Sequence, residues 1–423
     1  MRQALRQGHQ PDPDSIRVEE FINAFHYRYN PPRDHAPLGW DAVYGPCPWN
    51  PAHGLLRVAV QAREVELSAR PATNLVLLID TSGSMSPRER LPLLRTAFSR
   101  MIEQLDARDR VAIVTYAGSA GIALEPTAGS DHERIREALN TLNSGGGTHG
   151  SEGIRTAYEL ARRSFVHGGQ NRVMLATDGD FNLGITDQND LENMIRNEAA
   201  SGVLLTVLGV GDSASGDRQM EHLADCGDGV YAFLDNAEAA QHALNEQLTS
   251  NLVTVARNAK IQLFFNPATV SGWKLIGYTN RQLAKRDFND DRVDGGEVGA
   301  GHQVTALYEI IPSGDANPFV NVDADHPDRA SGLCRLRLRW QPVAGGASQL
   351  LERDISTTRE ATLDRESGWA AAMAMTGLKL HGELQQVPWS SVITLAKRCA
   401  ETRERSEALE VLYQAAGLRN RAE

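Results

Sequence analysis

Five side chains that carry oxygen atoms stand at positions that a parallel sheet would bring together. Asp80 follows the apolar run "NLVLLI", and Ser82 and Ser84 come after it at alternate positions. Thr148 follows the glycine-rich stretch "NSGGG", and Asp178 follows the apolar run "RVMLAT". Because the carboxyl ends of parallel strands lie at one edge of a sheet, where such folds bind ligands, these side chains are expected to converge there.

Three hydroxyls and two carboxylates make a hard ligand set composed only of oxygen. Mg²⁺ prefers octahedral oxygen coordination and keeps several waters. Sulfur and imidazole, the ligands typical of zinc and copper, are missing from the set. The residues therefore predict a magnesium site, with Mn²⁺ as the alternative because it accepts the same ligands. The competing interpretation is a turn aspartate with serines that favour loops, and Thr148 and Asp178 weigh against it.

The elements that must position these residues lie between residue 74 and about 250. Continuous apolar strands such as "NLVLLI", "RVAIVTYA", "RVMLAT" and "VLLTVLGV" alternate with helical segments. Strands that are apolar on both faces indicate a mostly parallel sheet covered by helices on both sides. Residues 71–250 are therefore expected to form a doubly wound, Rossmann-like α/β domain.

The sequence on either side of this domain differs in kind. Residues 1–70 contain a short amphipathic helix and the stretch "LLRVAVQAREVEL", whose alternation predicts a half-buried strand. Residues 251–360 show strands between Gly, Pro and Asn turns, a pattern typical of an antiparallel sandwich. The strand at 55–67 is expected to join that sandwich, which would make the α/β domain an insertion. Residues 361–423 are expected to be helical.

Composition argues against several classes of protein. The chain has 423 residues and a net charge of −11, and it has no basic run of the kind that binds nucleic acid or anionic membranes. No apolar run approaches the roughly 18 residues of a transmembrane helix. The N-terminus lacks the apolar core of a signal peptide. The four cysteines form no CxxC pair that would indicate a zinc or redox site.

The motif "DTSGSM" matches the D-x-S-x-S pattern of von Willebrand factor type A domains, which this segment resembles. In that family the motif, a loop threonine and a second aspartate form the metal-ion-dependent adhesion site. The resemblance implies that Asp80, Ser82, Ser84, Thr148 and Asp178 form the site here. The hydroxyls would contact the ion directly and the aspartates often through water. An Asp or Glu carboxylate of a protein partner would complete the coordination.

Longer stretches, among them "GPCPWNP", "NRVMLATDGDFNLGI" and "KIQLFFNPATV", are similar to one bacterial subfamily, the YfbK-like proteins. The resemblance covers nearly the whole chain. Members join an A domain to a conserved N-terminal segment and a C-terminal domain of unknown function. They often begin with an export or lipoprotein signal, which implies the cell envelope. Without such a signal, a complete chain would be expected in the cytoplasm.

The expected function is Mg²⁺-dependent binding of a protein partner rather than catalysis. A metal-independent scaffold is the second interpretation. A hydrolase with Ser84 as nucleophile, His149 as base and Asp178 as orienting group is the third, although no G-x-S-x-G elbow surrounds Ser84. The acidic, glycine-rich stretch 287–297 is interpreted as a solvated turn. A second cation site is the alternative there, but Arg292 stands where a calcium loop needs glycine.

Overall fold

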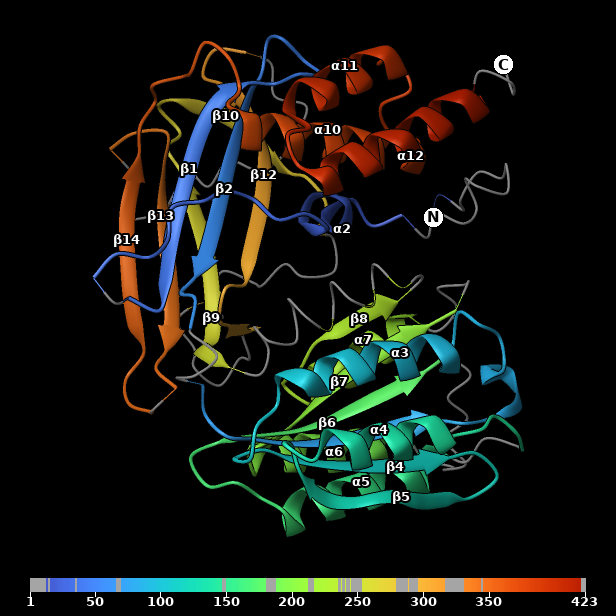
Figure 1. The fold of residues 1–423 in the computed structure, drawn as a ribbon. Coiled ribbons are helices and arrows are strands. Elements are labelled where there is room, and N and C mark those ends of the chain that lie inside the picture. Colours follow the sequence, from blue (N-terminus) through green and yellow to red (C-terminus); the bar gives the residue numbers. More distant parts are fainter. Residues whose placement is uncertain are drawn as a thin grey trace. The chain divides into compact units, whose positions relative to one another are not determined.

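The structure is a computed structural model in which the chain forms two compact units (Figure 1). One unit is Val65–Thr254, and the other combines Met1–Glu64 with Val255–Glu423. The second unit is therefore discontinuous in sequence. The residues that the structure describes are 13, 16–34, 36–65, 70–146, 150–179, 188–211, 217–234, 237, 240, 244, 253–278, 288, 296–315, 331–343 and 345–419.

A six-stranded sheet with the order β5-β4-β3-β6-β7-β8 forms the centre of the α/β unit. Its parallel strands are β3 (Thr73–Asp80), β4 (Arg110–Tyr116), β6 (Gln170–Thr177), β7 (Val203–Val210) and β8 (Tyr231–Leu234). The edge strand β5 (Ala120–Ala128) runs antiparallel to β4. The predicted doubly wound, mostly parallel sheet is confirmed.

Helices cover both faces of this sheet and create two separate cores. Leu75, Leu77 and Ile79 of β3 belong to one core, whereas Val76 and Leu78 belong to the other. Successive side chains of a strand point to opposite faces, so a strand buried on both sides must be apolar throughout. The first core is completed by α3 (Leu91–Met101) and α4 (His132–Thr141), and the second by α5 (Gly150–Arg163), α6 (Gln188–Ala200) and α7 (Asp217–Cys226).

The edge strand β5 is an element that the sequence pattern did not predict. Leu124 and Thr127 are buried, but Ile122 is 43% exposed and most other side chains of the strand also reach solvent. The strand contains Pro126, which an edge position tolerates because one side of the strand forms no ladder of hydrogen bonds. A strand of this kind lacks the continuous apolar run that identifies the buried strands beside it.

Two four-stranded sheets make up the β-rich part of the second unit. The first has the order β1-β2-β12-β10 and the second β11-β9-β13-β14. Residues of both sheets, including Leu56, Val58 and Ile310 from the first and Leu336 and Ile355 from the second, share one core. The strands are β1 (Leu38–Pro46), β2 (Gly54–Ala62), β9 (Thr254–Phe265), β10 (Val270–Leu275), β11 (Gly296–Gly299), β12 (Gln303–Pro312), β13 (Cys334–Gln341) and β14 (Gln349–Ile355).

Strand β2 joins the two sequence segments of this unit. It pairs antiparallel with β1 on one side and with β12 on the other, so that Ala59 lies opposite both Asp41 and Thr305. A strand that precedes the α/β unit is thus paired with a strand that follows that unit, and the paired residues Ala59 and Thr305 are about 250 positions apart in the sequence. Strand β1 was not predicted, because its apolar residues are interrupted by glycine and aspartate.

Helices pack on the face of the first sheet that points away from the sandwich core (Figure 1). They are α2 (Val18–Asn23), α10 (Arg365–His381), α11 (Trp389–Cys399) and α12 (Arg403–Arg419). α10 is buried along most of its length, and Gly377 brings it so close to α2 that a Cβ there would lie 3.2 Å from the Cα of Val18. Thr402 precedes the first residue of α12, and its hydroxyl accepts the N–H of Arg405 as an N-cap does. A new helix therefore begins there, after the end of α11.

A buried guanidinium fastens this helical layer to the sheet. Arg57 of β2 is 1% exposed and donates to Asp41 (2.8 Å), to Ser367 Oγ (2.8 Å) and to Asp364 (3.4 Å). Its guanidinium lies 4.8 Å from the centre of the Tyr29 ring. A buried charge needs such partners because its desolvation is costly. The arrangement ties the start of α10 to β1 and β2.

The α/β unit contains a comparable buried ion pair. Asp109 is fully buried immediately before β4, where it accepts hydrogen bonds from the Arg70 guanidinium. It also accepts main-chain N–H groups of Thr73 (2.8 Å) and Asp106 (2.7 Å). One carboxylate therefore joins the entry of β3 to the turn before β4.

We expect Asp109→Ala to lower the free energy of unfolding by about 3–5 kcal/mol, because it leaves the buried Arg70 charge without its main partner. Urea denaturation followed by circular dichroism measures the change. The control is Glu103→Ala, whose pair with Arg136 (3.3 Å) is exposed and should contribute less than about 1 kcal/mol. Equal effects of the two substitutions would contradict the assigned role of Asp109.

Candidate metal centre

Asp80 is the last residue of β3, a central strand with neighbours on both sides. Its side chain is fully buried. One carboxylate oxygen accepts the main-chain N–H of Ser82 (2.8 Å), and the other accepts the hydroxyl of Thr177 (3.3 Å), the last residue of β6. These bonds hold the carboxylate at the corner between β3 and β6, at the carboxyl edge of the sheet.

Ser82 and Ser84 lie on a single tight turn after Asp80. Ser82 precedes the short 3-10 helix η3 (Gly83–Met85), and Met85 is fully buried in the core beneath it. This anchor turns both hydroxyls to the same side, where their Oγ atoms are 3.0 Å apart. Adjacent ligands of an octahedral Mg²⁺ ion, with bonds of about 2.0–2.1 Å, are separated by about 2.9 Å. The spacing of the two hydroxyls therefore fits two neighbouring coordination positions.

The loop that leads towards Thr148 is fixed against this turn. Gly145 N–H donates to Thr81 O (2.8 Å), and Gly83 N–H donates to Gly146 O (3.3 Å). The Ser144 and Ser86 hydroxyls are 2.9 Å apart. Thr148 itself lies outside the described residues. The structure thus describes its loop up to Gly146, two residues before the predicted ligand, and that part of the loop contacts the Asp80 turn.

Asp178 follows β6 and its side chain is 1% exposed. Its carboxylate accepts Arg90 Nη1 at 2.5 Å, and the same nitrogen donates to Ser84 O at 2.9 Å. Arg90 precedes α3 and is 22% exposed. A guanidinium therefore bridges the second aspartate and the serine turn. The structure brings together Asp80, Ser82, Ser84 and Asp178, the four predicted residues that it describes.

The electrostatics of the corner favour a positive charge. Burial raises the pKa of the Asp80 carboxyl, the hydrogen bonds from Ser82 oppose the shift, and the negative charge of Asp178 adds to it. Burial and the Asp80 charge likewise raise the pKa of Tyr116, which ends the neighbouring strand β4. An all-oxygen set of this kind, with two buried carboxylates and two aligned hydroxyls, fits a hard divalent cation.

Sequence reasoning did not identify Arg90 and Thr177. Thr177 stands next to Asp178 in the stretch "ATDGD", so its place at a strand end was visible. Its hydrogen bond to Asp80 depends on β6 lying beside β3, which the pattern of single strands does not reveal. Arg90 gives no signal, because nothing in the local sequence distinguishes it from Arg88 in the same loop before α3.

Two other predicted positions lie wholly or mostly outside the described residues. One is His149, proposed as a base in the hydrolase interpretation. The other is the stretch 287–297, of which only Phe288, Gly296 and Glu297 are described. Phe288 is buried, and the Arg337 guanidinium lies 5.2 Å from the centre of its ring.

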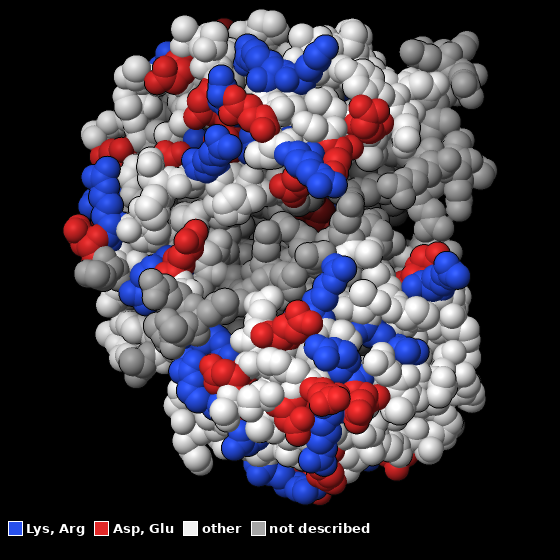
Figure 2. All heavy atoms as spheres, in the orientation of Figure 1, with Lys and Arg blue, Asp and Glu red and all other residues white. Residues whose placement is uncertain are grey.

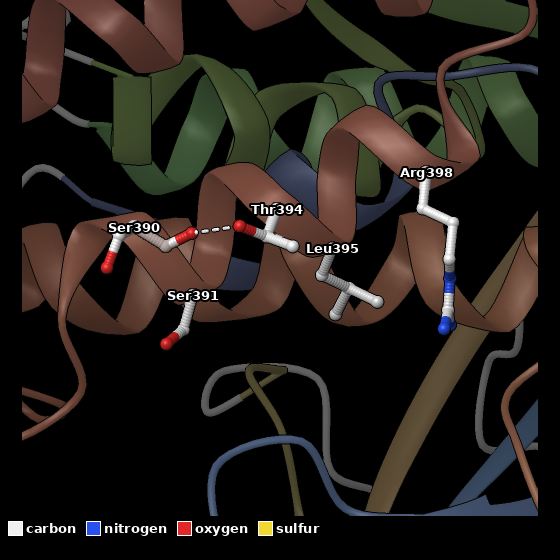
Figure 3. Close-up of a pocket in the computed structure, with 5 residues that line it drawn as sticks. All are labelled: Ser390, Ser391, Thr394, Leu395 and Arg398. Atoms are coloured by element: carbon white, nitrogen blue, oxygen red, sulfur yellow. Dashed lines mark hydrogen bonds between the residues drawn. The ribbon is translucent and has the colours of Figure 1, made fainter.

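A separate surface hollow of 370 Å³ runs along α11 in the second unit (Figure 3). Its described lining comes from one helix and includes Ser390, Ser391, Thr394, Leu395 and Arg398. The Thr394 hydroxyl donates to the Ser390 carbonyl (2.7 Å), so it serves its own helix. The described residues of this lining offer polar contacts but do not form a set of groups arranged for chemistry.

Comparisons with known families identify the α/β unit. Residues 74–247 match the von Willebrand factor type A domain, and residues 1–57 match a model described as von Willebrand factor. A solved von Willebrand factor type A protein from Catenulispora acidiphila superposes with a TM-score of 0.50, at 13% identity and over 91% of both chains. The family match and the fold thus define a protein with a von Willebrand factor type A domain, a class that commonly mediates protein–protein interaction.

The remainder of the chain identifies the family. Residues 250–418 match the model described as "Uncharacterized protein YfbK, C-terminal". The chain is 38% identical to the uncharacterized protein YfbK of Escherichia coli, over 93% of this chain and 71% of that protein. It belongs to the YfbK family. A second relative, the uncharacterized protein sll0103 of Synechocystis, is 29% identical over 45% of this chain and 44% of its own length.

The surface is mixed in charge. In Figure 2, basic and acidic side chains are interspersed over the face that is drawn, and its described residues form no stripe of one sign such as nucleic acid-binding proteins present. Within the described ranges, none of the helices combines the length and the apolarity needed to cross a membrane.

The raised pKa of Asp80 gives a prediction with a defined sign. The folded state binds the proton more tightly than the unfolded state, whose carboxyl has its ordinary pKa of 3.8. Without metal, stability is therefore lost as pH rises from that value through the raised folded-state pKa. We expect Asp80→Asn in EDTA at neutral pH to melt at a higher temperature than the wild type.

Mg²⁺ should reverse the order of the two melting temperatures, so that the wild type melts above Asp80→Asn. An ion at 100 times its dissociation constant stabilises the folded state that binds it by about 2.7 kcal/mol. Differential scanning calorimetry with and without Mg²⁺ measures both effects. The control is Asp190→Asn at an exposed position of α6, which should keep the Mg²⁺-dependent rise. An equal rise in wild type and Asp80→Asn would place the ion elsewhere.

Proposed function

We propose that the protein holds a divalent cation, Mg²⁺ or Mn²⁺, at the Asp80 corner and uses it to bind an Asp or Glu carboxylate of a protein partner. The observation that carries the proposal is the 3.0 Å spacing of the Ser82 and Ser84 hydroxyls beside two buried carboxylates. Such a set matches the ligands and the spacing that Mg²⁺ requires. Thr148 is proposed as the fifth ligand.

The chain's own residues would supply a site that is ready before the partner arrives. Asp80 is held by Ser82 N–H and Thr177, and Met85 fixes the serine turn in the core. Little ordering is then needed on binding, which favours affinity. A bound ion would supply an electrophilic centre with coordination positions open to an incoming carboxylate oxygen.

The rim of the corner is accessible to a partner. Gly83, Ser86, Gly145 and Gly146 are exposed, and Ser84 is half-buried between them. Three of these rim residues are glycines, which let another backbone or side chain approach closely. The geometry supports contact with a protruding acidic side chain rather than with a ligand that must be enclosed.

Binding rather than turnover is the proposed role. The Ser84 hydroxyl lies beside the Ser82 hydroxyl, and the Asp178 carboxylate accepts the Arg90 guanidinium. A hydrolase nucleophile instead needs a base within hydrogen-bond reach, and that base needs a third group to orient it. Among the described residues, the contacts of Ser84 and Asp178 thus support the binding interpretation.

A metal-independent scaffold is the second candidate, and one observation favours it. Arg90 already places a positive charge against Asp178 and bonds to the Ser84 carbonyl. In this alternative the guanidinium would stabilise the corner permanently. The two candidates differ in what removal of the Arg90 charge should do to the affinity for metal.

We expect Arg90→Gln to raise the affinity for Mg²⁺ by about tenfold, or about 1.4 kcal/mol. The substitution removes a positive charge that repels the ion and competes for Asp178, while the amide can still donate to the Ser84 carbonyl. Isothermal titration calorimetry measures the affinity. Arg95→Gln on α3 is the matched control, because its guanidinium contacts Leu142 O instead. Unchanged or weaker binding in Arg90→Gln would favour the scaffold.

Partner capture should depend on both the serines and the ion. We expect the wild-type chain, immobilised in Mg²⁺, to retain a protein that EDTA releases. Ser82→Ala/Ser84→Ala should lose at least about nine-tenths of that capture, because the substitutions remove two of the proposed ligands. Quantitative pull-down with mass spectrometry provides the measurement.

The control for this experiment is Ser390→Ala/Ser391→Ala, which removes two exposed hydroxyls of α11 and should leave capture intact. Blocking the carboxylates of the captured protein with a carbodiimide and an amine should abolish rebinding. Capture that persists in EDTA and in the Ser82/Ser84 variant would refute the ion-mediated role.

A further inference from the structure

Three side chains of different chemistry meet where α6 lies beside α7. These two helices cover the face of the α/β unit's sheet that is opposite to α3. Glu192 of α6 places Oε2 3.1 Å from His222 Nε2 of α7. The same nitrogen of His222 lies 3.8 Å from the Cys226 sulfur. Together the three potential ligand atoms lie within 4.8 Å of one another. This cluster is distinct in sequence and in ligand type from the Asp80 corner.

The two helices position the cluster through ordinary packing. His222 and Cys226 are four residues apart on α7, so their side chains lie on one face of the helix. Buried apolar residues of both helices, Ile195 of α6 and Leu223 of α7, belong to the same core and hold the helices together. Glu192 lies one helical turn before Ile195, close to the carboxyl-terminal half of α7.

We propose that Glu192, His222 and Cys226 bind a transition-metal ion of the zinc class. Thiolate, imidazole and carboxylate together are typical of Zn²⁺ and foreign to Mg²⁺. The cysteine spacing gave no indication of the site, because its ligands come from two helices and include only one cysteine. The inference is independent of the function proposed for the Asp80 corner.

The two distances measured from His222 Nε2 agree with a tetrahedral ion. Zinc bonds of about 2.0–2.1 Å to nitrogen and oxygen place two such ligands about 3.3 Å apart, and a sulfur bond of about 2.3 Å places sulfur about 3.6 Å from nitrogen. The observed separations are 3.1 Å for oxygen to nitrogen and 3.8 Å for sulfur to nitrogen. Each differs from the tetrahedral value by a few tenths of an ångström, which side-chain torsions can accommodate.

Burial is graded across the cluster. Cys226 is 2% exposed, Glu192 is 17% exposed and His222 is 48% exposed. A metal held by these three residues would keep its fourth position towards solvent, as in open zinc sites with three protein ligands. Binding would displace the proton of the thiol to solvent. Arg196 contacts Glu192 at 3.7 Å and also hydrogen-bonds to the Cys226 sulfur. Its side chain is 53% exposed, so these contacts are weak competitors that a bound ion would replace.

Cobalt absorption and zinc titration test the site in the full-length chain. Excess Mg²⁺ is present throughout to occupy hard-ligand sites. We expect one equivalent of Co²⁺ to produce a thiolate-to-cobalt charge-transfer band that Zn²⁺ then removes. Cys226→Ser should lack the band. His222→Ala should lower the zinc affinity at least about 100-fold. The loss of a residue that only hydrogen-bonds to a metal ligand already lowers metal affinity by about 10–100-fold, and His222 would be a ligand itself.

The controls separate binding from folding and from the other site. His167→Ala removes an exposed imidazole of the same unit and should bind zinc as the wild type does. His222 is half-exposed, so its variant should keep the circular dichroism of the wild type. Asp80→Asn should retain the band, because it alters only the Asp80 corner. No band in the wild type, a band in Cys226→Ser, or equal zinc binding by His222→Ala and His167→Ala would overturn the proposal and leave an ordinary His–Glu pair.

Discussion

The carboxyl edge of the α/β unit's sheet depends on one constraint: a carboxylate is held out of water at the end of a central strand. Asp80 is fully buried, and an ionised carboxylate in such a place is costly unless hydrogen bonds or a cation compensate for the lost water. The Ser82 N–H and the Thr177 hydroxyl provide part of that compensation. Asp178 adds a second negative charge nearby, which makes the ionised form of Asp80 still more costly. The serine turn and Arg90 surround this concentration of negative charge, which explains why hydroxyls and a guanidinium gather at this corner.

The same corner is rigid for reasons that lie in the core. Met85 anchors the turn from below, and Gly145 donates to Thr81 from the neighbouring loop. Loops at the edge of a sheet are commonly the most variable part of a fold, but here main-chain bonds join two of them. The ordering of the oxygen atoms is therefore achieved during folding, so that an ion would find them already close together. The two proposed sites would also select different metals. The strand ends offer only hard oxygen ligands, whereas the Glu192–His222–Cys226 cluster mixes oxygen, nitrogen and sulfur.

The second unit shows how a discontinuous domain can be stable. β2 precedes the α/β unit and is paired along its length with β12, which follows it. Arg57 extends that connection to the helical layer through Asp41 and Ser367. Neither sequence segment could form the first sheet without the other, because β2 and β12 each need the neighbouring strand for their hydrogen bonds. The match of residues 250–418 to the family's C-terminal model thus covers only one of the two parts from which this unit folds.

The sequence by itself determined the class of fold, the strands buried on both faces and the oxygen-bearing side chains that follow those strands. Those features depend on local pattern: apolar runs that end in Asp80 and Thr177, and hydroxyls at alternate positions after the first run. Only the tertiary structure decided which strands are neighbours, and with that the bond from Thr177 to Asp80 and the approach of Arg90 to Asp178. It also decided the exposed edge strand β5 and the meeting of Glu192 with His222. The physical reason is that such contacts join residues far apart in the chain, and their formation depends on how whole elements pack, which no local periodicity records.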